Sequence, residues 1–518
     1  MFSNSMMTAV ETAVTMVMVI IATPALIENF GVASYGAFVF LNIFSIYGAL
    51  FFFDLGMEGS LTTYIARYDA SSDRKKMQQS LVVAILYYGT LGALVGLGLL
   101  FASDFIAYRF VEVKGELSRD AVKAALHILS VNVLLQFLAL PFVAVLQGLR
   151  RYVLTKSVNT IATVIQYTLI IIVSYYHGSI DKAFLVVTCM SLARLLFYLG
   201  TFTIGIPQFR PMSLRVELSQ LRVLVSYSSV LFVCRILGLV NNNVHKLAIW
   251  LYMPVTNLAI YDVVVKPSNA LRVPDTVAGT SIIPEVARLH ALGRKDEIAG
   301  MYIRLIRYTY LVLVPMVVFL AVFISHLLRI WVGEQFVPYA WAVYILLFAF
   351  LLAPVSSQAF LSVVGLERIR NAIWISIVGT ALNATLSLTL LHYLGLAGLL
   401  LATVTMYAFM FWPYIRQLAR HVGLRPTTVV AAIGKTLGLA APFAGAYLLV
   451  EHFLSGRTLI MLGVAAVIGI AHLAAEYHWL LNGRERDFVG SRLGLGSRFT
   501  AEPSTHVRAD QPTPLNPR

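Results

Sequence analysis

Long apolar runs recur from residue 6 to residue 481, and short polar segments separate them. A helix needs about 20 mostly apolar residues to cross a bilayer. By this criterion the pattern predicts about fourteen membrane-spanning helices, and the expected fold class is an all-α integral membrane protein. The spans are expected at 6–27, 35–60, 80–103, 124–148, 157–176, 182–204, 221–250, 255–283, 308–328, 339–363, 371–391, 396–415, 429–449 and 458–481.

The composition agrees with this pattern. The 518 residues are 59% hydrophobic and 12% charged, whereas soluble globular proteins have about 45–50% apolar and about 25% charged residues. These values exclude a large soluble enzyme and a disordered chain. Cys189 and Cys234 lie inside expected spans and indicate no disulfide framework. The first apolar run contains Glu11 and follows no basic segment, so we expect a retained helix and not a signal peptide.

The distribution of basic residues predicts the orientation. Loops on the side of the C-terminus, with the tail, carry 26 Lys and Arg, and loops on the other side carry 7. Cytoplasmic loops are the ones enriched in Lys and Arg. Both termini of this multi-pass protein are therefore expected in the cytoplasm. The net charge of +14 is explained by this topology, so no nucleic-acid partner is expected.

The chain resembles itself at an offset of about 217–221 residues. Chance similarity between apolar segments is the alternative, but the matching positions of the loops favour a repeat. Six spans in each half preserve orientation, so the repeats are expected to be parallel. The matching segments are Ala66–Tyr68 with Ala287–Leu289, and Gln147–Arg151 with Val364–Arg368. The expected units are two six-helix bundles at 1–204 and 205–420, an extra helix pair at 421–481 and a disordered cytoplasmic tail at 482–518.

Basic residues inside the seventh and eighth spans predict an anion-binding site. A charge at mid-bilayer costs about 2.5–3.5 kcal/mol on insertion scales, so it faces a cavity or a partner. Helical periodicity places the polar residues of each span on one face. The alternative is that these charges pair and lock helices together, since Asp262 and Lys266 have i, i+4 spacing. The predicted anion-binding residues are Arg235, Asn242, Lys246, Lys266, Asn269 and Arg272.

Acidic residues in the first spans are the candidates for a coupling ion. Tyr47, Asp54 and Glu58 share a face at i, i+7 and i+11, and Glu11 lies in the first span. With Asp262 they are the expected carriers of a proton or cation. The alternative for Asp54 and Glu58 is a position at the lipid headgroups. Because these spans begin each half, their polar faces are expected to meet in a charged central cavity.

Other catalytic chemistry is not indicated. The histidines lack metal-ligand spacing, and no phosphate-binding glycine loop or nucleophile constellation is present. No extramembrane segment before the tail exceeds roughly 25 residues, which is too short for a catalytic domain. We therefore expect no enzyme activity, cofactor or metal. Arg194 and Lys435 lie in otherwise apolar spans and are expected to pack structurally or to extend toward the membrane surface.

Several short motifs resemble the Wzx-type oligosaccharide flippases, the polysaccharide biosynthesis proteins of the multidrug/oligosaccharidyl-lipid/polysaccharide exporter superfamily. They are Gly31 with Tyr35–Gly36, Asp54–Gly56, Ala66–Tyr68, Tyr261, Pro284–Arg288 and Gly365–Arg368. The resemblance implies two six-helix bundles, a place in the bacterial inner membrane and alternating access. A further implication is the export of undecaprenyl-pyrophosphate-linked glycans for surface polysaccharide or exopolysaccharide. It also implies membrane lipid, a polysaccharide polymerase and chain-length proteins as partners. Relatives often carry a cation in the first span, which this chain lacks, and spans 13 and 14 resemble the extra pair of lipid II flippases.

Two other functions remain as alternatives. A multidrug-type exporter of the same superfamily would favour an acidic cavity, whereas four cations occupy spans 7 and 8 here. A membrane glycosyltransferase or ligase would need a large external loop with catalytic residues, and the longest expected external loop has about 20 residues. The sequence therefore favours a flippase for lipid-linked oligosaccharides.

Overall fold

The computed structural model describes residues 2–45, 54, 56–112, 118–206, 236–241, 243–279, 282–481, 483 and 485–486. All regular structure in these ranges is helical. Eleven helices among the described residues are long and apolar enough to cross a membrane. The expected all-α integral membrane fold is thereby confirmed.

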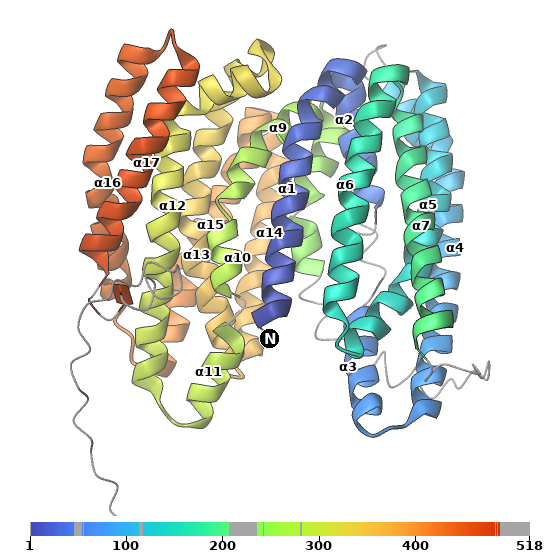
Figure 1. Cartoon of the computed structure of the whole chain (residues 1–518). Coiled ribbons are helices and arrows are strands. Elements are labelled where there is room, and N and C mark those ends of the chain that lie inside the picture. The colour runs from blue at the N-terminus through green and yellow to red at the C-terminus, as the bar shows by residue number, and fades with distance from the viewer. Residues whose placement is uncertain are drawn as a thin grey trace, which may run out of the picture.

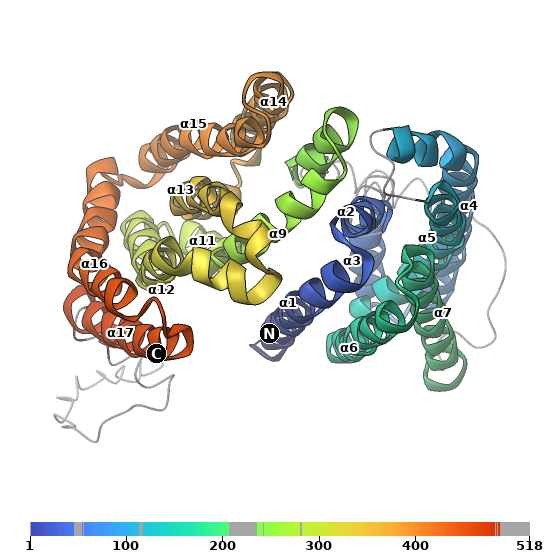
Figure 2. The same cartoon turned by 90° about the horizontal axis from the view of Figure 1, so that it is seen from above.

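The helices of the N-terminal half form one group, which lies on the right in Figure 2. They are α1 (Phe2–Phe30), α2 (Val32–Leu41), the 3₁₀ helix η1 (Asn42–Phe44), α3 (Met57–Ala70), α4 (Arg74–Glu112), α5 (Arg119–Gly148), α6 (Tyr152–His177) and α7 (Ile180–Gly205). Within the group, α5 packs on α4 and α7, and α1 packs on α6.

The remaining helices form a second group. Residues 236–241 and 243–252 are helical, and the further helices are α9 (Thr256–Ala270), α10 (Val273–Gly279), α11 (Ile282–Ala291), α12 (Lys295–Val332), η4 (Glu334–Tyr339), α13 (Ala340–Gly365), α14 (Ile369–Leu394), α15 (Leu396–Val422), α16 (Pro426–Leu454) and α17 (Thr458–Leu480). The hairpin of α16 and α17 packs on α12.

The two ends of the molecule differ in charge. The N-terminus, α3 and α11 lie at the lower end in Figure 1, together with the turns that precede α4, α6, α12, α14 and α16. Each of these turns brings an arginine to the helix start, and we call this the basic end. The opposite end, where α1, α6 and α14 finish, is called the far end. The arginines are Arg74, Arg151, Arg294, Arg368 and Arg425.

Two expected spans are not continuous helices. The span predicted at 35–60 is divided into α2 with η1 and, after an interruption, α3. Gly56 precedes α3 with φ 80°, which a residue without Cβ adopts easily. The span predicted at 255–283 is divided by the turn between α9 and α10. Pro274 and Pro284 lie in the first turns of α10 and α11, where a missing N–H is tolerated. The span at 221–250 lies partly outside the described residues.

A close helix contact occurs in both halves at residues that the sequence offset relates. A methyl group on Gly148 would lie 2.8 Å from the Cβ atom of Ile65, and one on Gly365 would lie 2.8 Å from the Cβ atom of Val286. The two glycines are 217 residues apart, and Ile65 and Val286 are 221 apart. In each half a glycine at the end of one helix therefore allows close approach of the short amphipathic helix.

Turn conformations recur in the same way. Residues with positive φ occur in pairs at the offsets of 217 and 221: Ser72 (56°) with Gly293 (70°), Arg150 (60°) with Glu367 (61°), and Gly178 (57°) with Gly395 (55°). Non-glycine residues seldom adopt this conformation, so its recurrence is informative. These pairs support the proposed repeat, while the domain boundaries stay a prediction.

Candidate functional site

A polar cavity of about 180 Å³ lies where the two groups meet, between α1, α2, α6, α9 and the helix that contains Lys246. Apolar side chains of α1 and α2 form part of its wall. The polar groups that line it are Thr23, Tyr35, Asn42, Tyr167, Lys246, Asp262 and Lys266. Three of the residues predicted from sequence are thus brought together, namely Lys246, Asp262 and Lys266.

Lys266 is the centre of a hydrogen-bonded cluster that joins the two groups. Its Nζ atom lies 2.5 Å from Asp262 Oδ2 on the same helix. It also donates to Thr23 Oγ1 of α1 at 2.7 Å and to the Tyr35 hydroxyl of α2 at 2.5 Å. The Tyr35 hydroxyl in turn donates to Asp262 Oδ2 at 2.6 Å. An ammonium has three donors, so every N–H of Lys266 is used.

This cluster is largely shielded from solvent. The side chains of Lys266 and Asp262 are 17% and 15% exposed, and Tyr35 is buried. Hydrogen bonds to charged groups are stronger than neutral ones. Because Thr23 and Tyr35 belong to the N-terminal group and the ion pair belongs to α9, the cluster links the groups. We call these four residues the latch.

Lys246 is the second cation of the cavity. It is half-buried and lines the same wall as Asp262 and Lys266. Within the described part of the chain no ion pair to Lys246 is present. Two lysines and one carboxylate give the cavity a formal charge of +1, and the carboxylate is already bound to Lys266. An anion that enters the cavity therefore meets Lys246 as an available donor.

Further contacts join the two groups between the cavity and the far end. The Arg109 guanidinium donates to the carbonyl of Leu251. The rings of Phe40 and Trp250 stack with centroids 4.7 Å apart. Gly36 of α2 lies so close to α9 that a methyl group on it would overlap the carbonyl oxygen of Val255. The far ends of the two groups are thus held together.

The other acidic candidates lie elsewhere. Glu11 forms an ion pair with Lys156 of α6 at 2.7 Å. Asp54 is fully buried and accepts hydrogen bonds from the Tyr88 hydroxyl and from the Glu58 backbone N–H. Neither Glu11, Asp54 nor Glu58 lines the cavity. Gly56 has a positive φ and interrupts the helix between Asp54 and Glu58, so the predicted continuous helical face is wrong for these two acids. Tyr47 lies outside the described residues, and its part in that face stays a prediction.

The remaining predicted anion-binding residues do not line the cavity. Asn269 and Arg272 are exposed near the turn between α9 and α10. The Arg272 guanidinium lies 5.9 Å from the ring centroid of Phe350. Arg235 and Asn242 lie outside the described residues, so their part in the site stays a prediction.

Sequence reasoning missed the hydroxyl groups of the site. Thr23, Tyr35 and Tyr167 lie in apolar spans where one hydroxyl does not alter the hydropathy pattern. The position of Tyr35 beside Gly36 was the available signal in the sequence. The small size of Gly36 permits close contact with α9, and this brings the Tyr35 hydroxyl near the residues of that helix. Arg194, expected to pack structurally, donates to the Gln166 amide oxygen at 2.8 Å. Lys435 is exposed on α16.

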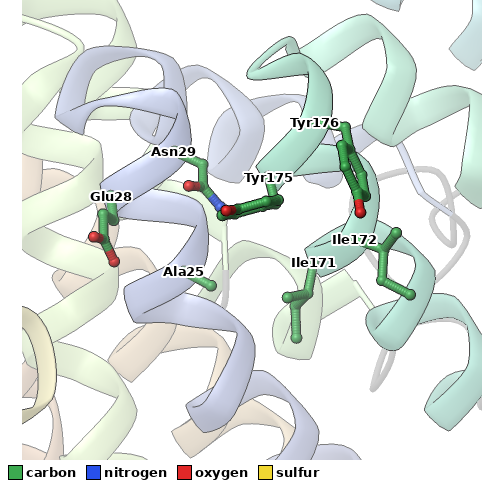
Figure 3. A pocket seen from close by; sticks show the side chains of 7 residues that line it. All are labelled: Ala25, Glu28, Asn29, Ile171, Ile172, Tyr175 and Tyr176. Atoms are coloured by element: carbon green, nitrogen blue, oxygen red, sulfur yellow. The ribbon is translucent and has the colours of Figure 1, made fainter.

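A second, larger cavity of about 480 Å³ lies between α1 and α6 at the far end (Figure 3). The side chains of Asn29 and Tyr175 point toward one another there, and Asn29 donates to Ser174 Oγ at 3.0 Å. Tyr175 and Tyr176 are both 74% exposed. Tyrosines are enriched where membrane meets water. We therefore assign this cavity to the membrane surface and not to a path between the groups.

The comparisons with known proteins agree with this architecture. The family model described as "Polysaccharide biosynthesis protein" matches residues 30–341. No curated protein matches the chain.

Solved transporters share the fold. The lipid II flippase MurJ in an inward closed conformation has a TM-score of 0.69 at 13% identity, covering 91% of this chain and 99% of its own. An inward-facing multidrug resistance MATE family transporter of the MOP superfamily has a TM-score of 0.64 at 14% identity, covering 79% and 98%. An outward-facing transporter of that family has a TM-score of 0.53 at 15% identity, covering 80% and 96%. The structural likeness is one of fold.

Proposed function

Since this chain belongs to the polysaccharide biosynthesis protein family, we propose that it is a flippase for undecaprenyl-pyrophosphate-linked oligosaccharide repeat units. It would move them across the bacterial inner membrane by alternating access, for surface polysaccharide or exopolysaccharide biosynthesis. The observation that carries this proposal is the cationic cavity between the two helix groups, with Lys246 available and Lys266 held by the latch.

The chemistry of the substrate fits a cavity of this charge. A pyrophosphate crossing the bilayer loses its water, and an unpaired charge in an apolar medium is very costly. Ammonium and guanidinium groups replace the lost water by charge-assisted hydrogen bonds. The polyprenyl tail can stay in lipid throughout. In this proposal Lys246 binds the pyrophosphate first, and Arg235 and Asn242, on the same predicted face, complete the site.

The latch suggests how binding is coupled to opening. Lys266 is held by Asp262, Tyr35 and Thr23 in the described conformation. An anion next to Lys246 competes with these oxygens for the Lys266 ammonium. Transfer of Lys266 to the anion breaks its bonds to α1 and α2, and the far ends can then separate. A substrate shifts the equilibrium toward the open form only if it binds the open form better than the closed form.

The partners and orientation follow as part of the same proposal. Both termini and the basic end would face the cytoplasm, because the arginine-rich turns gather there. Lipid-linked oligosaccharide and membrane lipid would be the direct partners, with a polysaccharide polymerase and chain-length proteins acting afterwards. The hairpin of α16 and α17 packs on the outer side of α12, where it can extend the lipid-facing surface.

A multidrug-type exporter of cations is the nearest alternative. It would need an acid that is available to the drug, but Asp262, the acid that lines the cavity, is bound to Lys266. An enzyme of the glycosyltransferase or ligase class is favoured by no feature of the described residues. The flippase therefore remains the function that the site supports best.

The test is transport of a lipid-linked oligosaccharide in vesicles that contain the purified full-length protein. We expect Lys246→Ala and Arg235→Ala each to reduce transport at least tenfold while insertion is retained. Arg235→Lys should recover only part of the activity, because a point charge does not reproduce the guanidinium fork. Lys435→Ala removes an exposed lysine of α16 and serves as the control. Normal transport by the Lys246→Ala, Arg235→Ala double variant would refute the site.

A further inference from the structure

The cavity at the far end between α1 and α6 lies apart from the latch (Figure 3). Its volume of about 480 Å³ falls in the range of about 300–1,000 Å³ that is usual for small-molecule sites. Ile171, Tyr175 and Tyr176 of α6 form one wall, and Glu28 and Asn29 of α1 supply polar groups opposite. Binding sites for small molecules combine an apolar wall with a few polar groups in this way.

The polar groups of this cavity are acidic or neutral. Glu28 is exposed, and within the described part of the chain its carboxylate forms no ion pair and no hydrogen bond. None of the residues that line the cavity is a lysine or an arginine. A phosphate that enters here therefore meets a like charge and no cation. The anionic part of the proposed substrate is thereby excluded from this cavity, whereas Lys246 and Lys266 attract it to the other one.

The amide of Asn29 is held in place by α6. Its Nδ2 atom donates to Ser174 Oγ at 3.0 Å, and Ser174 Oγ donates to the carbonyl of Ile171 at 2.8 Å. Among the described residues no other hydrogen bond to the Asn29 side chain is present. An amide has two N–H donors and one oxygen acceptor, so one N–H and the oxygen stay available to a ligand. A hydroxyl group both donates and accepts, and it therefore matches this pair.

The two tyrosines add flat apolar surface beside these polar groups. Tyr175 and Tyr176 are each 74% exposed, and their rings meet edge to face with centroids 5.4 Å apart. Tyr175 points toward Asn29 in Figure 3. The face of an aromatic ring is electron-rich, and it attracts the C–H bonds on one face of a sugar ring. The hydroxyls at the edge of that sugar can then reach an amide and a carboxylate.

The far-end cavity follows the cavity of the latch along the same two helices. Tyr167 of α6 lines the cavity of the latch, and Ile171 and Tyr175, four and eight residues later, line the far-end cavity. Residues at these spacings lie on the same side of a helix. Eight residues span about 12 Å of helix. An oligosaccharide whose pyrophosphate is bound near Lys246 can therefore extend its sugars to the far-end cavity.

We propose that Glu28, Asn29, Tyr175 and Tyr176 form a carbohydrate-binding site for neutral, hydroxyl-rich sugars. The inference deepens the proposed function, because it rests on that function for the source of the sugar, the oligosaccharide of the lipid-linked substrate. The two cavities then divide the substrate between them, since one binds the pyrophosphate and the other binds sugars. Because Glu28 repels the pyrophosphate, the site holds the sugars on the expected outer side without retaining the lipid-linked end.

Saturation-transfer nuclear magnetic resonance on the full-length protein in lipid nanodiscs measures sugar contact without transport. The probe is the oligosaccharide that mild acid releases from the lipid-linked repeat units of the cells that make this protein. Tyr175→Ala and Asn29→Ala should each weaken binding roughly tenfold, whereas Tyr175→Phe keeps the ring and should bind nearly as well as the wild type. Tyr393→Ala is the matched control, because it removes an 84% exposed tyrosine outside the cavity. No signal with the wild type, or equal affinity in the Tyr175→Ala, Asn29→Ala double variant, would overturn the proposal.

An ammonium headgroup is the other ligand that a carboxylate and two aromatic rings attract. Glu28→Gln separates the two, because its amide oxygen still accepts from a hydroxyl but no longer pairs with a cation. This variant should keep oligosaccharide binding. Phosphatidylethanolamine that stays on the wild type in native mass spectra, leaves Glu28→Gln and blocks the oligosaccharide would count against a sugar site. If wild-type vesicles move no lipid-linked oligosaccharide, the flippase proposal fails, while the binding measurement still decides the site.

Discussion

Replacement of Tyr35 by phenylalanine tests the latch with the loss of one oxygen atom. The ring stays in place, and with it the contact of Lys266 with the ring, 5.2 Å from its centroid. The donor to Asp262 and one acceptor of Lys266 disappear. When the far ends separate, water can serve both charged groups, so the loss weighs on the closed form alone. The closed form should therefore lose population.

The size of the effect follows from the kind of hydrogen bond. A hydrogen bond to a charged group contributes about 1.5–3 kcal/mol. Because Lys266 and Asp262 still bind one another, we count one such bond and not two. The ratio of closed to open far ends should then fall roughly 10- to 150-fold, since each 1.4 kcal/mol is a factor of ten. Thr23→Val removes a single acceptor of Lys266 and should give a similar or smaller change.

Pulsed electron paramagnetic resonance can measure this ratio. Spin labels at positions 176 and 393 would report the distance between the far ends of α6 and α14, at side chains that are 74% and 84% exposed. Both native cysteines are first replaced by serine. Tyr35→Phe should add a population with a longer distance. Tyr167→Phe is the matched control, because it lines the cavity without a described hydrogen bond to the other group. Identical distributions for wild type and Tyr35→Phe would refute the reasoning.

Three further outcomes are expected. Gly36→Ala should push α2 from α9 and lower the closed population in the same measurement, because overpacking costs about 1–3 kcal/mol. The pKa of Asp73 lies below its usual 3.8, because the backbone N–H and the side chain of Lys76 bind its carboxylate. Asp73→Ala should lower the free energy of unfolding by about 1 kcal/mol at pH 7, measured by thermal unfolding. The difference between the two proteins should vanish as pH falls through that lowered pKa. Cysteines at 295 and 456 should react with an impermeant maleimide only at 456 in intact cells.

The apolar runs predicted most of the fold because lipid imposes one strong constraint on length and polarity. Eleven of the expected spans lie in helices that can cross a membrane. The interruption before α3 was not predicted, since the run at 35–60 is mostly apolar across it. In the span at 255–283, Pro267, Pro274 and Pro284 predict a bend, but not the turn that divides α9 from α10. Gly56 with positive φ and Pro274 in a first turn mark these breaks, but single residues hardly change a window average.

The site was predicted in part. Lys246, Lys266 and Asp262 carry charge within spans, and charge in lipid is a strong signal. Tyr35 and Thr23 join Lys266 across 231 and 243 residues of chain, a relation that helical periodicity does not contain. No partner was predicted for Glu11. Lys156, with which it forms an ion pair, was expected in the loop before the span at 157–176, whereas α6 begins at Tyr152 and includes Lys156.

The two longest helices among the described residues can act as levers. α4 and α12 have 39 and 38 residues, or roughly 57 Å each at 1.5 Å per residue, so they exceed the roughly 30 Å of hydrocarbon. They are long arms, one in each group, that reach from the basic end toward the far end. A tilt of about 10° moves one tip of such an arm by about 10 Å relative to the other. A small rotation between the groups after release of the latch therefore suffices to separate the far ends by the width of a sugar ring.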